Sequence, residues 1–269
     1  MASIARTFDW IVRRLRGAAV PFQLVGGAAA RAYGATRPVV DLDFYVPDEV
    51  LAALHDALTP YAAGAPSRVV SDHWDVACLA VTHEGQAIEL GGADSARFRR
   101  GPSAPWNAAA VAFDRATPVR VFGVTVPVMA RDQLLAYKKV LGREVDLLDC
   151  HELSGPHPVP TRLAVYGSLA PGAANHRVVA SLRGSWEQGS VYGRLHPEGW
   201  GMTYGFPGLV WHPDGDRIPV TLLTSADLPG AWERLDVFEG EGYRRAPIPV
   251  TVSDGTKRIA QLYLVRERS

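Results

Sequence analysis

Apolar residues follow two patterns along the chain, and the change between them divides it into two parts. Up to about residue 150, segments with apolar side chains at helical spacing alternate with segments of strand type, so a mixed order of helices and strands is expected. After about residue 161, short β-type runs punctuated by glycine and proline predominate. The segment HELSGPHPVPT, residues 151–161, holds three prolines and a glycine. We therefore expect a domain at 1–152, a linker at 153–161 and a second domain at 162–269.

The expected elements follow from these patterns. In the first part we expect helices at 4–16, 27–34, 48–58 and 131–141, and strands at 22–25, 40–46, 76–82, 86–90 and 125–128. In the second part we expect strands at 163–167, 189–195, 219–224, 247–252 and 260–265, with one helix from about Ser225 to Phe238. A turn is expected at Glu84-Gly85, between two strands.

Composition narrows the function classes. The 269 residues are 47% hydrophobic and 21% charged, as in ordinary globular proteins, and the formal net charge is zero. Neither half has the basic excess of a dedicated nucleic-acid-binding protein. The two cysteines, Cys78 and Cys150, exclude a disulfide scaffold and a thiolate zinc site, and they fit a reducing, cytoplasmic location. No run is long and apolar enough to span a bilayer, so no membrane association is expected.

The run FQLVGGAAARAYGATRPVVDLDFYV holds the first group of candidate residues. Gly26 and Gly27 end a strand and begin a helix, where bare backbone N–H groups can hold phosphate oxygens. Asp41 and Asp43 lie two apart on a strand, so both carboxylates project from one face. With Glu89 as a third carboxylate, they would hold Mg²⁺, which prefers oxygen ligands and substrate phosphates. The plainer interpretation is a strand edge with solvated aspartates after a tight turn.

These residues resemble the nucleotidyltransferase superfamily of the DNA polymerase beta type, and most closely its minimal bacterial members. The resemblance covers residues from about 20 to 150. It implies that Gly26, Gly27, Arg37 and Lys138 bind a nucleotide and that Asp41, Asp43 and Glu89 hold the metal. The later run LLAYKKVLGREVDLLD is similar to the closing helix of that family, with Lys138 and Arg143 ahead of Asp146 and Asp149. Two departures stand out: Ala28 replaces a common serine, and Val39 and Val40 replace a common threonine.

A second group of candidate residues lies after the proline-rich break. Tyr166, Gly167, Ser168 and Leu169 end a strand in a glycine turn, where successive N–H groups and a hydroxyl suit a carboxylate ligand. Glu239 stands just before Gly240, at the expected end of a helix, next to apolar residues. Burial there would raise its pKa into the range useful for proton transfer. The plainer interpretations are an ordinary turn and a solvated C-terminal glutamate.

The second part resembles the gamma-glutamylcyclotransferase family, in its short gamma-glutamylamine-type form. The resemblance spans residues 163 to about 265 and rests on four pieces in order: YGSL at 166–169, Asn175-His176, VYGRL at 191–195, and Leu235-Asp236 with Glu239-Gly240, Tyr243 and Arg245. It implies that Tyr166 to Leu169 and Tyr243 bind the glutamyl group, with Glu239 as general acid and base. No cofactor is required for this chemistry.

Together the two resemblances imply a two-domain α/β (α+β) protein: a mixed sheet with helices, followed by a small β-barrel with one or two helices. The expected activity is release of 5-oxoproline from a small γ-glutamyl amine or amide, in a bacterial-type fusion. Two alternatives stay open. One is Mg²⁺-dependent nucleotidyl transfer by the first domain, with a nucleotide as ligand and a small molecule, RNA or protein as acceptor. The other is a binding protein whose first domain is inactive.

Overall fold

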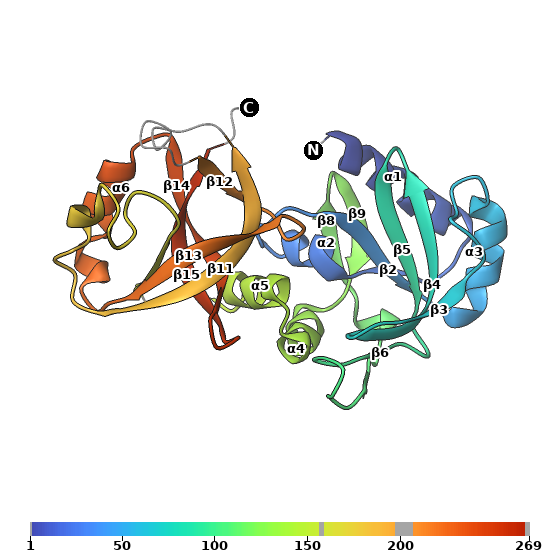
Figure 1. The fold of residues 1–269 in the computed structure, drawn as a ribbon. Coiled ribbons are helices and arrows are strands. Elements are labelled where there is room, and N and C mark those ends of the chain that lie inside the picture. Colours follow the sequence, from blue (N-terminus) through green and yellow to red (C-terminus); the bar gives the residue numbers. More distant parts are fainter. Residues whose placement is uncertain (1, 156–158, 197–206, 267–269) are drawn as a thin grey trace. The chain divides into compact units, whose positions relative to one another are not determined.

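The computed structural model describes residues 2–155, 159–196 and 207–266, and it divides the chain into two compact units, Met1–Leu153 and Ser154–Ser269 (Figure 1). We call them unit 1 and unit 2. Both combine helices and strands, so the α+β class is confirmed. Among the described residues, none of the helices has both the length and the apolar character to cross a membrane.

Unit 1 is a mixed sheet with helices on both faces. Its helices are α1 (Ala2–Gly17), α2 (Gly26–Ala32), α3 (Leu51–Leu58), α4 (Arg131–Leu141) and α5 (Glu144–Leu153), with short 3₁₀ turns at Asp48–Val50 and Phe113–Arg115. Its strands are β1 (Gln23–Leu24), β2 (Asp41–Val46), β3 (Ser67–Val70), β4 (Trp74–His83), β5 (Gln86–Gly92), β6 (Arg97–Phe98), β7 (Asn107–Ala108), β8 (Thr117–Val121) and β9 (Val124–Val128).

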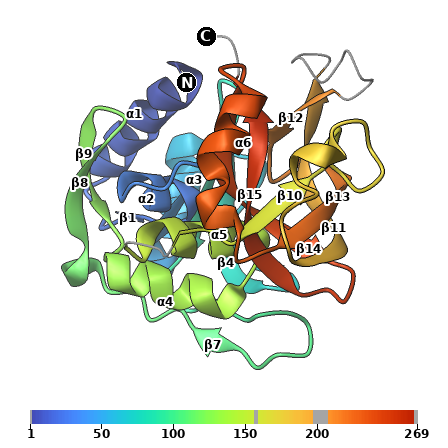
Figure 2. The same cartoon turned by 90° about the vertical axis from the view of Figure 1, so that its left-hand side faces the viewer.

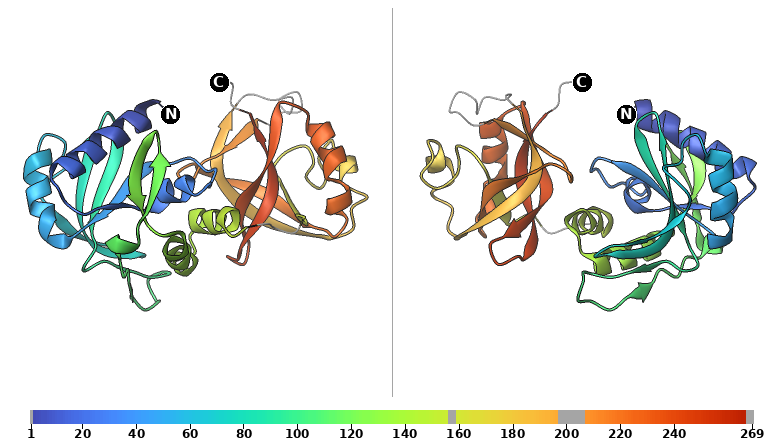
Figure 3. Two further views of the ribbon diagram at one scale, coloured as in Figure 1. Left: turned by 180° about the vertical axis from the view of Figure 1, so that it is seen from behind. Right: turned by 45° about the vertical axis from the view of Figure 1, so that its right-hand side comes forward.

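The strand order of unit 1 is β7-β6-β4-β5-β2-β1-β9-β8, and β3 also pairs with β4. At the centre of this sheet β2 runs parallel to β5, whereas β4 and β5 form an antiparallel hairpin. The right-hand view of Figure 3 shows α1 and α3 on one face of the sheet and α2, α4 and α5 on the other. Because side chains alternate along β2, its two faces meet different surroundings.

The face of β2 toward α1 is apolar. Phe44 stacks on Phe8 of α1 with 6.0 Å between ring centroids, and Leu42 is fully buried. Burial of such side chains stabilises each by roughly 1.5–3 kcal/mol. Asp41 and Asp43 therefore point to the opposite face of the sheet, where α2 and α4 lie.

Unit 2 is a closed barrel with one additional strand and a covering helix (Figure 2). Its strands are β10 (Arg162–Val165), β11 (Ser185–His196), β12 (Gly208–Trp211), β13 (Asp216–Thr224), β14 (Tyr243–Val252) and β15 (Lys257–Val265). Five of them follow the order β11-β13-β10-β15-β14, and the pairs Gly189 with Val252 and Ser190 with Thr251 close the ring. Strand β12 pairs with β11 outside this ring.

The helix α6 (Trp232–Glu239) packs on one end of the barrel core of unit 2. Trp232 and Leu235 belong to a buried cluster with Leu163 of β10 and Val265 of β15. Ahead of α6 lies the 3₁₀ turn Leu228–Gly230, and a second such turn spans His176–Val178. The core of unit 2 thus holds the helix against the strands that carry the candidate residues.

Most expected elements are confirmed, and three differences have physical reasons. The expected helix at 225–238 begins only at Trp232, because Pro229 interrupts the hydrogen-bond ladder and leaves a 3₁₀ turn before it. The expected closing helix is two helices, since Gly142 takes φ +60° after α4. Four strands of unit 1 were not expected, namely β3, β6, β7 and β8, because short strands form only through their partners.

Candidate active site

Strand β10 delivers the YGSL segment to one end of the barrel of unit 2. The strand pairs with β13 and β15 and ends at Val165, so Tyr166 to Leu169 follow as a turn. The amide of Ala170 donates to the carbonyl of Gly167 at 3.0 Å, and the amide of Asn175 donates to the carbonyl of Ser168 at 2.9 Å. These two bonds hold the backbone of the turn in one shape.

Helix α6 brings Glu239 to the same place from a distant part of the chain. Trp232, Leu235 and Glu239 lie on one face of this helix, because the spacings of three and seven residues return to the same side. Trp232 and Leu235 pack into the core, and Glu239 is buried with them. The helix ends there, since Gly240 takes φ +74°. The helix end expected at Gly240 is therefore confirmed.

The turn and the helix end line a shared recess of about 440 Å³ that is open to solvent. Its lining includes Tyr166, Ser168 and Glu239, together with Tyr243 and Tyr263 from β14 and β15. The structure thus brings together all the residues that the sequence assigned to a glutamyl site.

Burial raises the pKa of Glu239 to about 7, and it is the one resolved cause of this shift. An ordinary glutamate is ionised at neutral pH, whereas this one divides between its two protonation states. A group in that condition can accept and return a proton in one reaction cycle. The expectation drawn from its position in the sequence therefore has a structural basis.

Two tyrosine hydroxyls beside the recess have defined hydrogen bonds. The hydroxyl of Tyr166 accepts a hydrogen bond from the amide of Leu209 at 3.1 Å, and burial raises its pKa. The hydroxyl of Tyr263 donates to Asp236 Oδ1 at 2.7 Å. Sequence reasoning missed Tyr263, because it lies 24 residues beyond Glu239 in a run of buried residues that carries no sign of a site.

The second group of candidate residues lies on unit 1. Asp43 of β2 is the register partner of Glu89 on β5. Asp41 lies two residues before Asp43 on β2, so its side chain is on the same face of the sheet. Burial, and then the charges of Asp41 and Glu89, raise the pKa of Asp43 to about 8. Burial and Asp41 also raise the pKa of Glu89. The three predicted metal ligands therefore form one acidic group on a single face of the sheet.

The glycine turn packs directly against this acidic group. Gly26 takes φ +64°, and a Cβ atom at this position would lie 1.9 Å from Asp43 Oδ2. The amide of Gly26 donates to the hydroxyl of Tyr137 at 3.1 Å, so this N–H already has a partner. At Gly27 a Cβ atom would lie 2.7 Å from the Arg37 guanidinium. Close approach of side chains thus accounts for both glycines.

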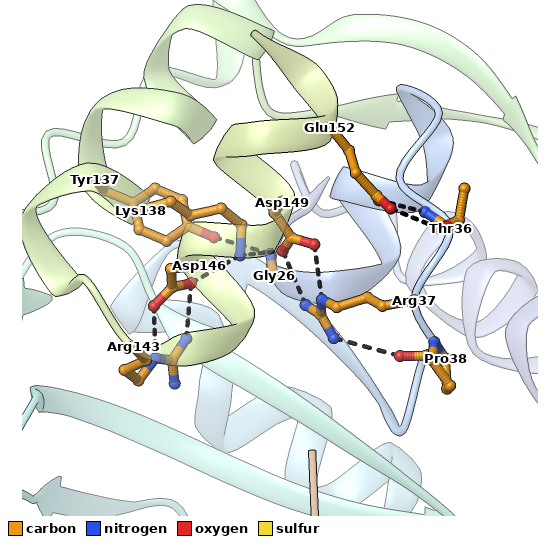
Figure 4. A network of polar contacts seen from close by, with 10 residues as sticks. All are labelled: Gly26, Thr36, Arg37, Pro38, Tyr137, Lys138, Arg143, Asp146, Asp149 and Glu152. Atoms are coloured by element: carbon orange, nitrogen blue, oxygen red, sulfur yellow. Dashed lines mark hydrogen bonds and ion pairs between the residues drawn. The ribbon is translucent and has the colours of Figure 1, made fainter. Parts of the chain in front are cut away.

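The two predicted phosphate-binding cations of unit 1 are held by carboxylates (Figure 4). Arg37 donates through Nε and Nη2 to Asp149 at 2.7 and 3.0 Å, and its Nη1 donates to the carbonyl of Pro38. Lys138 Nζ lies 2.8 Å from Asp149 and 3.0 Å from Asp146. Both cations are buried. In this arrangement they support the turn, and their role toward a nucleotide stays a prediction.

The carboxylate oxygens of the acidic group are ligands that suit a metal ion, but they are not arranged as a metal site. Among the described residues, no group of three or more His, Cys, Asp or Glu side chains could hold a metal ion as these side chains lie. The donors nevertheless suit Mg²⁺, which takes one or two carboxylates and completes its shell with water and substrate phosphates. A cation would also relieve the repulsion that raises the pKa of Asp43. Metal binding by Asp41, Asp43 and Glu89 stays a prediction.

Comparison with known families agrees with the second resemblance. Residues 163–269 match the family model described as "Gamma-glutamyl cyclotransferase, AIG2-like". No curated protein matches the chain.

Three solved structures illustrate what the chain is similar to in fold. An AIG2-like protein from Mus musculus is 20% identical, with 41% of this chain and 80% of that chain covered and a TM-score of 0.34. A candidate nucleotidyltransferase from Thermotoga maritima is 19% identical, with 51% and 84% covered and a TM-score of 0.43. The lincosamide antibiotic adenylyltransferase LnuA is 12% identical, with 56% and 96% covered and a TM-score of 0.39.

Proposed function

We propose that unit 2 is a γ-glutamylcyclotransferase that releases 5-oxoproline from a γ-glutamyl amine or amide. The observation that carries this proposal is the buried Glu239, whose pKa is raised to about 7 in a recess formed by the YGSL turn. The family match over residues 163–269 supports the same activity. We further propose a cytoplasmic location, because the chain has only two cysteines, Cys78 and Cys150, as is usual in a reducing compartment.

The reaction needs one group that moves a proton twice. The Glu239 carboxylate takes a proton from the α-ammonium group of the substrate, and the resulting amine attacks the γ-carbonyl carbon. A new C–N bond closes the five-membered ring, and the ring nitrogen releases its second proton to water. The tetrahedral carbon then expels the former amine, which leaves with the proton returned by Glu239. Attack within one molecule favours ring closure, because nucleophile and electrophile are already held together.

The rest of the recess binds the glutamyl group in this proposal. Backbone N–H groups of the turn at 166–169 and the hydroxyl of Ser168 receive the substrate carboxylate. Tyr243 and Tyr263 also line the recess. The leaving amine points toward the open side of the recess.

The variant Glu239→Gln tests the proposal. It keeps the shape of the side chain but removes the proton transfer, so turnover of γ-glutamyl amines should fall by about 10²- to 10⁴-fold. Turnover is measured as 5-oxoproline released from a panel of γ-glutamyl amines. Glu233→Gln is the matched control, because Glu233 lies on the same helix but is exposed. Near-full turnover by the Glu239→Gln variant, or none by the unchanged protein, would refute the assignment.

We propose nucleotidyl transfer as a second candidate function, located on unit 1, because the acidic group of Asp41, Asp43 and Glu89 favours it. Lys138 and Arg143 lower the pKa of Asp43, but burial and then the charges of Asp41 and Glu89 outweigh them and hold it at about 8. In this candidate function the three carboxylates would hold Mg²⁺, which would neutralise the phosphate charge of a nucleotide. Asp43 would stay beside the glycine turn because Gly26 leaves it room.

Thermal unfolding with ligands tests this second function. Mg²⁺ alone and nucleotide alone should each bind weakly, whereas both together should raise the melting temperature. ATP, CTP, GTP and UTP are compared, each with and without Mg²⁺. Asp43→Asn should abolish the joint effect, and Asp114→Asn, at an exposed position, should keep it. A joint effect without product points to a binding protein, and no effect with any nucleotide rejects the function.

A further inference from the structure

The helix that carries Glu239 has little stability of its own. Helix α6 spans only eight residues, and its N-terminus at Ala231 has no side-chain cap. Helices this short are marginal in water, so tertiary contacts decide where this one lies. Trp232 and Leu235 bury its first turns, but Glu239 is its last residue, in the turn where helices fray.

One side chain ties this last turn to the barrel. Asp236 accepts two hydrogen bonds from Arg245, to Oδ1 from Nε at 2.8 Å and to Oδ2 from Nη2 at 3.0 Å. Its Oδ1 also accepts the 2.7 Å hydrogen bond from the Tyr263 hydroxyl. Arg245 and Tyr263 are register partners on β14 and β15, so the two donors lie side by side on one face.

The surroundings keep this cluster rigid and ionised. The Arg245 guanidinium lies 4.4 Å from the ring centroid of Trp232, at the other end of α6. The hydrogen bonds from Arg245 and Tyr263 lower the pKa of Asp236 despite its partial burial. A two-point carboxylate–guanidinium pair has a defined geometry, which a single bond lacks. The cluster therefore holds the helix at both ends.

We propose that Asp236 is a positioning residue for the cyclotransferase reaction. Through Arg245 and Tyr263 it anchors the last turn of α6, and this anchor holds the Glu239 carboxyl in the buried part of the recess. The proposal rests on the proposed function of unit 2. It also assigns Tyr263 two roles, because the same ring lines the recess beside Glu239.

The consequence for Glu239 is measurable without any substrate. The titratable groups around it are Tyr166, Tyr243 and Tyr263, which line the recess with it, and the pair of Asp236 and Arg245 one helical turn away. None of them is a resolved cause of its pKa shift, which comes from burial. If the anchor is released, Glu239 gains solvent and its pKa falls.

The experiment follows the Glu239 carboxyl by NMR titration in the full chain, with Glu239→Gln to assign its signal. In Asp236→Asn the pKa of Glu239 should fall from about 7 toward the value near 4.3 of an unburied glutamate. In the same variant kcat should fall about 10- to 100-fold, with a smaller change in KM, because misplacement of a catalytic group affects the chemical step. In the pH profile of kcat, the part that depends on ionisation of Glu239 should move to lower pH by the same number of pH units.

Two further variants and a control make the outcome decisive. Arg245→Lys keeps the charge but loses the two-point contact, and Tyr263→Phe removes one hydrogen bond, so both should give smaller shifts in the same direction. They replace Asp236→Asn if that variant does not fold. Asp227→Asn is the control, since it breaks another two-point Arg–Asp pair of unit 2, Arg183 with Asp227, and should leave Glu239 unchanged.

An unchanged Glu239 pKa in the folded anchor variants, or an equal shift in the Asp227 control, overturns the positioning role. This readout does not depend on catalysis. If the unchanged protein does not turn over γ-glutamyl amines, the proposed function fails instead, and the pKa measurement still decides whether Asp236 places Glu239.

Discussion

Glu239 and Asp43 both have raised pKa values, but for different physical reasons. For Glu239 burial alone accounts for the shift to about 7. For Asp43 burial comes first and the repulsion by Asp41 and Glu89 follows, with a value of about 8. The first is the condition of a single group that exchanges protons, and the second is that of an acidic group that attracts a cation.

The raised pKa of Asp43 makes the stability of unit 1 depend on pH. Its folded pKa lies above the unfolded value near 3.9, so the folded state binds more protons between these values. Stability should therefore fall as pH rises from about 4 to 8. Asp43→Asn removes this penalty, so it should clearly stabilise the protein at pH 8.5 and change its stability little at pH 4.5.

Thermal unfolding without metal at both pH values measures this difference. Asp114→Asn again serves as the control, because its side chain is exposed and should show no such dependence. An equal effect of Asp43→Asn at both pH values would show that Asp43 is ionised in the folded protein at pH 4.5. The raised pKa would then be wrong.

Among the elements of unit 1, α4 and α5 form a support for the glycine turn. Gly142 ends α4 and separates it from α5. As a result, Asp146 and Asp149 of α5 face Lys138 of α4. Asp149 also reaches Arg37, which lies 112 residues earlier. Tyr137 of α4 completes the support, because its hydroxyl accepts a hydrogen bond from the Gly26 amide. Buried charges thereby hold the glycine turn to α4 and α5.

Asp149→Asn should destabilise unit 1 strongly. The change leaves Arg37 and Lys138 buried with one fewer carboxylate, and breaking a buried pair in this way costs about 3–5 kcal/mol. Asp9→Asn is the control, because Asp9 and Arg13 form an exposed pair one helical turn apart, worth about 0.3–0.5 kcal/mol. Denaturant unfolding followed by circular dichroism compares the two. Similar small losses in both would mean that the network adds no net stability.

Across the molecule as a whole, each unit has its own hydrophobic core and its own candidate chemistry. The core of unit 1 gathers around Phe8, Phe44 and Leu90, and that of unit 2 includes Leu163, Leu235 and Val265. The proline-rich segment stands between the two patterns in the sequence, and residues 156–158 within it lie outside the described residues. The domain boundaries expected from the sequence stay a prediction, although the structure divides the chain within a residue or two of the first of them.

Local patterns in the sequence were enough to predict most of the elements and to single out the candidate residues. Helical spacing predicted α1 and α4, alternation predicted β2 and β5, and Gly240 predicted the helix end at Glu239. These features depend on neighbours in the chain, since apolar periodicity and glycine conformation act over a few residues. For the same reason, the order of apolar residues and glycine is sufficient to place the YGSL turn at a strand end.

Which of these residues meet depends on the tertiary structure. The register of β2 with β5 sets Glu89 beside Asp43, and the closed barrel brings Tyr263 to Glu239 and Asp236. Arg37 and Lys138 both form ion pairs with Asp149. The sequence had predicted that these two cations contact a nucleotide. Asp236 and Tyr263 are 27 residues apart, and Arg37 and Asp149 are 112 apart. Such contacts depend on strand register and on how helices pack across a sheet, and no local pattern encodes either.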